Sequence, residues 1–153
     1  MSLEVKWRLA GEDTPGVLEV IPAVSNYFWN KLVKKGHNPC ASRIADRVYA
    51  AYYREDPDLT LLVVGSYAVL VTVTQPWWSP DLLLSEEAFV RLGTEGVFAD
   101  ALQGLEAFAK DAGCSAVVIS DTVSRSGKAY TRLLGMHGYR LVTNQHVKEI
   151  DNG

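Results

Sequence analysis

The stretch from Arg91 to Phe98 (RLGTEGVF) has the residue types of an anion-binding loop. It joins an arginine and two glycines, Gly93 and Gly96, to the start of an amphipathic helix. The first amides of a helix have no partner within the helix, and its dipole is positive at that end. The amides of Gly96, Val97 and Phe98 could therefore bind phosphate oxygens, with Arg91 beside them.

A second set of polar residues stands before the last predicted helix. Ser124, Arg125, Ser126 and Lys128 are small or cationic, and such residues at a helix start could hold phosphate oxygens. Capping of the helix by Ser124 or Ser126 is the simpler alternative. Arg125 is thus a second candidate for contact with an anion.

Two adjacent carboxylates, Glu86 and Glu87, lie on the predicted strand that leads into the glycine loop. A carboxylate on this strand could act as a general base, and we assign this role to Glu87. The alternative for both is a solvated carboxylate at a strand edge. The longest basic run, Lys31–Lys35, is interpreted as a solvated helix end, where cations are favourable.

A strand–helix–strand unit must position these residues. The predicted strands are Leu83–Leu92 and Ser115–Asp121, and the helix between them is Val97–Ala112, with apolar residues at three-, four- and seven-residue steps. Gly113 follows the helix where a left-handed cap is needed. A unit of this length forms a right-handed crossover, which predicts adjacent parallel strands. The centre of the second strand, AVVI, is fully apolar, as is typical of a strand covered on both faces.

The rest of the chain gives a helix pair and a hairpin before this unit and a closing segment after it. The order β-α-α-β-β-β-α-β-α-β indicates an α+β fold, with one mixed β-sheet flanked by helices. The predicted elements are a strand at Glu4–Ala10, a helix from Glu12–Pro15 kinked or divided at Pro22, a helix at Ala41–Arg54, a hairpin turning at Gly65-Ser66, a loop with Trp77 and Trp78, and one or two strands within Tyr139–Ile150.

Composition narrows the class of protein. With 153 residues and a net charge of −3, we expect a single domain over 1–153 without a basic surface for nucleic acid. No apolar run is long enough to span a membrane, and no signal peptide is recognisable, so we expect a cytoplasmic protein. Cys40 and Cys114 fit a reducing compartment. The spacing of His37, His137 and His146 predicts no metal site.

Four stretches resemble the GNAT superfamily of acyl-CoA-dependent N-acetyltransferases, and the resemblance spans nearly the whole chain. Trp7–Asp13 resembles the opening strand and helix start of that family, and LLVVGSYAVLVTVT resembles its central hairpin. SEEAFVRL, with the glycine loop and helix after it, resembles the acetyl-CoA motif. Leu134–Tyr139 resembles the late signature of the family. The resemblance implies a GNAT-like mixed β-sheet.

The resemblance also implies a function and roles for residues. Acetyl-CoA would be the cosubstrate, with its pantetheine arm on the strand edge at Phe89 and Val90 and its diphosphate on the glycine loop and helix start. The acceptor would be an amine, on a small molecule or a protein, and Glu87 would take its proton. The tyrosine that protonates the thiolate in the family falls on Leu134, and Tyr130, one turn earlier, could substitute or could be a packing or exposed tyrosine.

Two other functions remain open on the same resemblance. One is a GNAT-like structural or assembly protein without activity, for example a virion component, because small GNAT-like proteins occur in bacteriophages. The other is a regulatory module that binds acyl-CoA without turnover. Trp77 and Trp78 could contact an assembly partner, gate an acceptor pocket, or pack within their own loop.

Overall fold

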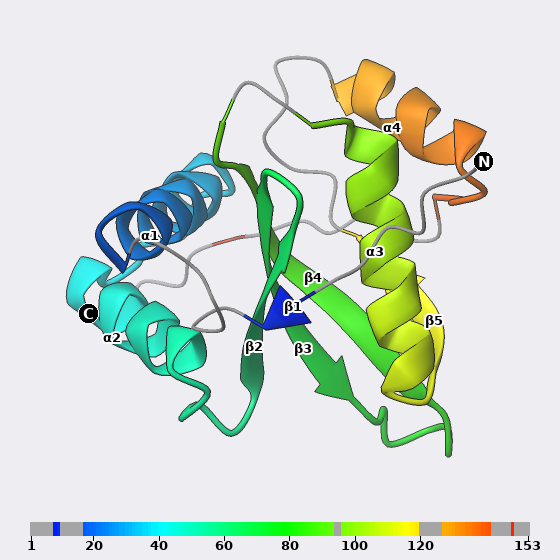
Figure 1. Ribbon diagram of the computed structural model, residues 1–153, viewed down its shortest axis with the longest axis horizontal. Coiled ribbons are helices and arrows are strands. Elements are labelled where there is room, and N and C mark those ends of the chain that lie inside the picture. Colours follow the sequence, from blue (N-terminus) through cyan, green and yellow to red (C-terminus); the bar gives the residue numbers. More distant parts are fainter. Residues whose placement is uncertain (1–7, 10–16, 94–95, 120–126, 142–147, 149–153) are drawn as a thin grey trace.

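The computed structural model describes residues 8–9, 17–93, 96–119, 127–141 and 148 (Figure 1). Their elements follow the predicted order. Of the predicted closing segment Tyr139–Ile150, residues 142–147 and 149–150 lie outside the described residues. The elements are β1 (Arg8–Leu9), α1 (Val17–Lys34), α2 (Ala41–Tyr52), β2 (Leu59–Val64), β3 (Tyr67–Thr74), β4 (Leu82–Arg91), α3 (Phe98–Asp111), β5 (Cys114–Val118) and α4 (Gly127–Met136).

The strands form one five-stranded mixed sheet in the order β1-β2-β3-β4-β5. The pairs β1–β2, β2–β3 and β3–β4 are antiparallel, whereas the pair β4–β5 is parallel. The predicted crossover between adjacent parallel strands is therefore confirmed. Helices α1 and α2 cover one face of the sheet, and α3 lies on the other with α4 beside it (Figure 1).

Two glycines hold the positive φ that their predicted places require. Val64 pairs with Tyr67, which leaves Gly65 and Ser66 as a two-residue turn with φ +55° at Gly65. Gly113 ends α3 with φ +80°. The hairpin and the helix cap are both confirmed.

The core has two layers because alternate residues of a strand point to opposite faces of the sheet. On β2, Leu61 and Val63 pack under α1 and α2, whereas Leu62 packs under α3. On β3, Leu70 belongs to the first layer and Val69 to the second. The central hairpin is thus buried on both sides and carries the helices of both layers.

Helix α1 is one helix, Val17–Lys34, with Pro22 inside it, so of the two expectations only the division into two short helices is tested here. Division at Pro22 is therefore wrong. Proline removes one hydrogen bond to the preceding turn. Burial of Val20 and Val24 on either side of Pro22 stabilises the helix against the sheet and offsets that loss.

Strand β5 is covered on one side and not on both, so the expectation from its apolar sequence is wrong. Cys114 and Val117 pack against the α3 layer, but Ser115, Ala116 and Val118 are exposed. Within the described residues β5 is the last strand of the sheet. An apolar run at an edge strand therefore has the same sequence pattern as a strand buried on both faces.

Gly104 allows α3 to approach β2 closely, and this predicts a stability effect. A Cβ at Gly104 would overlap Val64 Cγ1 and would lie 3.0 Å from Val64 Cγ2. We expect Gly104→Ala to lower the free energy of unfolding by about 1–2 kcal/mol, because overpacking outweighs the better helix propensity of alanine. Chemical denaturation measures this change.

The matched control for this prediction makes room for the new methyl group. Val64→Ala alone leaves a cavity, but together with Gly104→Ala the two changes compensate. We expect the double variant to lose less stability than the sum of the two single variants. A Gly104→Ala protein as stable as the wild type would contradict the close approach.

Candidate functional site

The site is centred on a β-bulge in β4. Leu70 of β3 pairs with Ala88, but its neighbour Val71 pairs with Glu86, so Glu87 has no partner on β3. A bulge of this kind bends the strand and re-aims a side chain. Ala88 packs under α1 and α2, and Glu87 lines a cavity on that same side. Two consecutive side chains thus share one face, which a regular strand does not allow.

The cavity has a volume of about 360 Å³ and lies between α1, α2 and the sheet. Most of its wall is apolar, with a few polar side chains, as is typical of small-molecule sites. Five elements contribute to the wall. Its apolar residues are Phe28, Ile44, Val48, Leu59 and Leu70, and its polar residues are Arg43, Arg47, Thr72 and Glu87.

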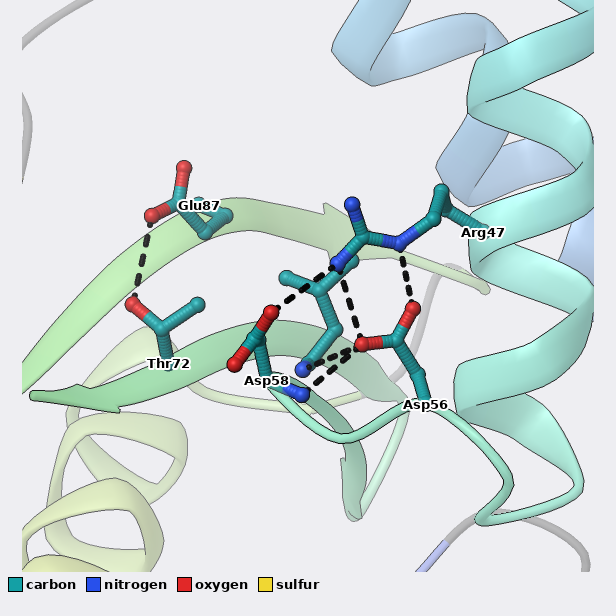
Figure 2. A network of polar contacts seen from close by, with 6 residues as sticks. Arg47, Asp56, Asp58, Thr72 and Glu87 are labelled. Atoms are coloured by element: carbon teal, nitrogen blue, oxygen red, sulfur yellow. Dashed lines mark hydrogen bonds and ion pairs between the residues drawn. The ribbon is translucent and has the colours of Figure 1, made fainter.

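The polar side chains of the wall have distinct partners (Figure 2). The Thr72 hydroxyl on β3 donates to Glu87 Oε1 at 3.4 Å, which is a long hydrogen bond. Arg47 on α2 forms a two-pronged pair with Asp56, with 3.0 Å between Arg47 Nη2 and Asp56 Oδ1. Arg47 Nη2 also lies 3.8 Å from Asp58 Oδ2. Among the described residues the Glu87 carboxylate has no comparable ion pair.

The pair between Arg47 and Asp56 ties α2 to the start of β2 and predicts sensitivity to acid. Hydrogen bonds from Arg47, and from the amides of Leu59 and Asp58, lower the pKa of Asp56 from 3.8 to about 2. This stabilisation is present above about pH 4 and is lost as the pH falls towards 2. We expect it to be about 1 kcal/mol, because the half-exposed Arg47 is screened by solvent.

Denaturation at a series of pH values tests this contribution. Asp56→Asn should have a lower free energy of unfolding than the wild type at pH 7. Between about pH 4 and pH 2 the variant should lose less stability than the wild type does. Asp58→Asn is the control, because the Asp58 side chain is 76% exposed. If wild type and Asp56→Asn lose stability in parallel over this range, the linkage to Asp56 is wrong.

A buried lysine reaches the bulge from α1. Lys31 is only 3% exposed, and its Nζ donates to the backbone oxygen of Glu87 at 2.7 Å. Nζ also lies 3.8 Å from Glu86 Oε1, and Glu86 is 4% exposed. Burial lowers the pKa of Lys31, although the Glu86 carboxylate opposes this shift. Burial and then Glu86 raise the pKa of nearby Tyr27 to about 12.

These burials correct two interpretations of the sequence. Lys31 is not part of a solvated helix end, although the exposed Lys34 fits that description. Glu86 is not a solvated edge carboxylate, because β4 lies between β3 and β5. Charged residues in a short local pattern give no sign of burial, since the contact between α1 and β4 joins residues far apart in the chain.

The edge of β4 beyond β5 is the candidate surface for the pantetheine arm. Within the described residues the ladder between these strands ends at the pair Ser85–Val118, whereas β4 continues to Arg91. Phe89 and Val90 lie on this continuation. Their side chains are buried on opposite faces of the sheet, so the backbone is what this edge offers. An extended chain can add to such an edge by hydrogen bonds.

The glycine loop and the start of α3 lie at the end of β4. The Arg91 guanidinium donates to the Gly96 carbonyl at 3.3 Å, and Val97 precedes the first residue of α3, Phe98. Val97 has no polar side chain that could cap the helix. Gly93, Gly96 and Val97 are all exposed. The structure thus brings Arg91 together with the helix start, as the sequence predicts.

The remaining candidates fall partly outside the described residues. Arg125 lies outside them, and Tyr130 lies in α4 with a side chain outside the described part. Leu134 is 7% exposed and packs in the α3 layer, so this position offers no proton donor to a ligand.

Trp77 and Trp78 lie in the connection between β3 and β4 and are 95% and 67% exposed. Neither lines the cavity described above. Packing of Trp77 within its own loop is therefore wrong, and neither ring lines this cavity, while gating of an acceptor pocket elsewhere stays a prediction. Contact with a partner stays a prediction.

Comparison with known proteins rests on structure. The sequence matches no protein-family model, and a search of curated proteins gives no significant match. A GNAT family acetyltransferase from Staphylococcus aureus has a TM-score of 0.60 and 15% identity, over 97% of this chain and 100% of its own. A transcriptional regulator from Bacillus halodurans has a TM-score of 0.66 and 14% identity, over 95% and 99%.

A third similar structure is an aminoglycoside acetyltransferase from an uncultured soil metagenomic sample, in complex with sisomicin. Its TM-score is 0.55 with 12% identity, over 97% of this chain and 96% of its own. Together with the order of elements and the parallel pair β4–β5, these similarities establish that the chain has the GNAT fold. No helix in the described part is long and apolar enough to cross a membrane.

Proposed function

We propose that this protein is an N-acetyltransferase that moves an acetyl group from acetyl-CoA to an amine in the cavity beside Glu87. One observation carries the proposal. The bulge turns the Glu87 carboxylate into a small-molecule-sized cavity on the same strand whose far end leads into the glycine loop. A base and an anion-binding helix start are thus joined by one short strand. The GNAT fold supports the same function, although a fold alone does not establish one.

The donor side uses the far end of β4. In this proposal the pantetheine arm adds to the strand edge at Phe89 and Val90. The diphosphate lies on the loop and helix start at Gly93, Gly96, Val97 and Phe98, and the guanidinium of Arg91 balances its charge. The described residues fit this group, because Arg91 already contacts the loop. Acetyl-CoA supplies the acetyl group as an activated thioester.

The acceptor side is the cavity. Glu87 takes the proton of the acceptor ammonium so that the free amine can attack the thioester carbonyl. Thr72 orients the carboxylate by its hydrogen bond. For the leaving thiolate we propose Tyr130 as the proton donor, since Leu134 has no acidic proton. A thiol with a pKa near 8.5 is a tolerable leaving group even without one.

The wall of the cavity indicates which amines fit. Its charged side chains are the guanidiniums of Arg43 and Arg47 and the single carboxylate of Glu87, and the rest is mainly apolar. A polycation such as an aminoglycoside would bring several ammonium groups to a wall with a single carboxylate, where Arg43 would repel them. We therefore propose a small monoamine with an apolar body as the acceptor.

Calorimetric titration with acetyl-CoA tests the donor side. We expect Arg91→Gln to raise the Kd about tenfold, because a charge-assisted contact with the diphosphate is lost. Lys110→Gln is the control, because Lys110 is exposed in the last turn of α3, at the opposite end from the loop. Equal Kd values for wild type and Arg91→Gln would contradict this placement.

The same titration separates the proposal from its alternatives. Binding with turnover supports the acetyltransferase, and binding without turnover supports a regulatory module. The exposed pair Trp77 and Trp78 favours the third possibility, a GNAT-like assembly component such as a virion protein. That function predicts neither binding nor turnover, and a bacteriophage origin is proposed from sequence resemblance only.

A further inference from the structure

We propose that Lys31 is a positioning residue that clamps the β4 bulge and so keeps the Glu87 carboxylate in the acceptor cavity. The inference rests on the proposed function, in which Glu87 is the base. Lys31 itself does not line the cavity. Lys31 contacts the backbone of Glu87 from α1, and the two residues are 56 positions apart in the sequence.

Within the part of the chain that the structure describes, Glu87 has no pairing partner in the sheet on either side of β4. It has no partner on β3, and it lies beyond Ser85, the last residue of β4 that pairs with β5. The Glu87 hydrogen bond is partly buried, and a carbonyl shielded from water is less stable without a donor, so a partner from elsewhere is favourable. Lys31 Nζ provides one at 2.7 Å, the length of a charge-assisted hydrogen bond.

The bulge decides which face Glu87 occupies. In a regular strand neighbouring side chains alternate, so Glu87 would point away from the face of Ala88. Ala88 packs under α1 and α2, and the opposite face carries the apolar layer under α3. Without the bulge Glu87 and Ala88 could not both lie on the cavity side, so if the fully buried Ala88 keeps its place, the Glu87 carboxylate leaves the cavity. A donor fixed to the Glu87 carbonyl opposes this rearrangement.

Stability alone does not explain a buried lysine here. Burying the ammonium of Lys31 and the carboxylate of Glu86 is costly, and apolar residues of similar size often replace such a pair without loss of stability. The pair therefore fits a role in specifying local geometry. The same reasoning supplies a variant that should fold, because Lys31→Met combined with Glu86→Leu removes both charges and leaves neither unpaired.

This double variant tests the proposal by kinetics. We expect kcat to fall about 100-fold, because a displaced base no longer reaches the amine, while the Kd of acetyl-CoA stays unchanged. In a Glu87→Gln background the same two changes should lower kcat no further, because the group that they position is already absent. Lys34→Met, on the exposed side of α1, is the control and should keep the wild-type rate.

Two results would overturn the proposal: a wild-type rate in the double variant, or the same fractional loss with and without Glu87→Gln. A crystal structure of the double variant gives a readout that needs no activity. We expect Glu87 to have left the cavity, and an unchanged bulge would overturn the clamp. If Glu87 moves but the wild-type protein acetylates no amine, the clamp stands and the proposed function fails.

Discussion

Replacing Glu87 with glutamine is expected to lower kcat for amine acetylation by about 10²–10⁴-fold, the usual contribution of a general base. Glutamine has nearly the same shape and can still accept the hydrogen bond from Thr72, but it cannot take a proton. Acetyl-CoA binding should not change, because the proposed diphosphate site lies at the far end of β4. Amine-dependent release of the thiol measures the rate, and calorimetry measures the Kd.

The pH dependence of this loss separates a base from a packing residue. A primary amine deprotonates by itself near pH 10, so the difference between wild type and Glu87→Gln should narrow as the pH approaches that value. Glu19→Gln is the control and should behave as wild type, because Glu19 is an exposed residue in the first turn of α1. Full activity of Glu87→Gln at neutral pH would mean that Glu87 is only a solvated carboxylate.

Filling the cavity from β3 is expected to weaken binding of the acceptor amine. Thr72 is half-buried on the cavity wall, and Thr72→Phe places a ring in a space of about 360 Å³. We expect the KM for the amine to rise at least tenfold, while the Kd of acetyl-CoA stays unchanged. The reason is steric, because a cavity of this size admits only a small acceptor.

Thr74→Phe is the matched control for the filled cavity. Thr74 is two residues further along β3, is exposed, and does not line the cavity. Phenylalanine is favourable in strands, so both variants should fold. If Thr72→Phe and Thr74→Phe have the same KM as the wild type, the acceptor binds elsewhere.

Local patterns in the sequence were sufficient to predict much of the fold. Apolar residues at helical spacing identify α2 and α3, and β-branched runs around Gly65 identify the central hairpin. The length of the segment between Arg91 and Cys114 fixes the crossover and hence the parallel pair β4–β5. The contact between Arg91 and the segment before α3 was also predictable, because the two are close in the sequence.

The acceptor side was not predictable in the same way, because it depends on pairing between distant segments. The bulge at Glu87 comes from the register of β3 against β4, which no local pattern specifies. The contact of Lys31 with the Glu87 carbonyl joins α1 to β4. The cavity itself combines α2 with the hairpin. Glu87 was chosen for its residue type, and its place in the cavity is known only from the fold.

Detection of the acetylated product tests the central claim most directly. Acetyl-CoA with an isotopically labelled acetyl group is incubated with the protein and a small apolar primary amine, and mass spectrometry follows the amine. We expect the labelled acetyl group on the nitrogen of the primary amine at a rate proportional to protein concentration, and none on a tertiary amine with the same body. Absence of label from every primary amine tested, with folded protein and saturating acetyl-CoA, would contradict the assignment as an acetyltransferase.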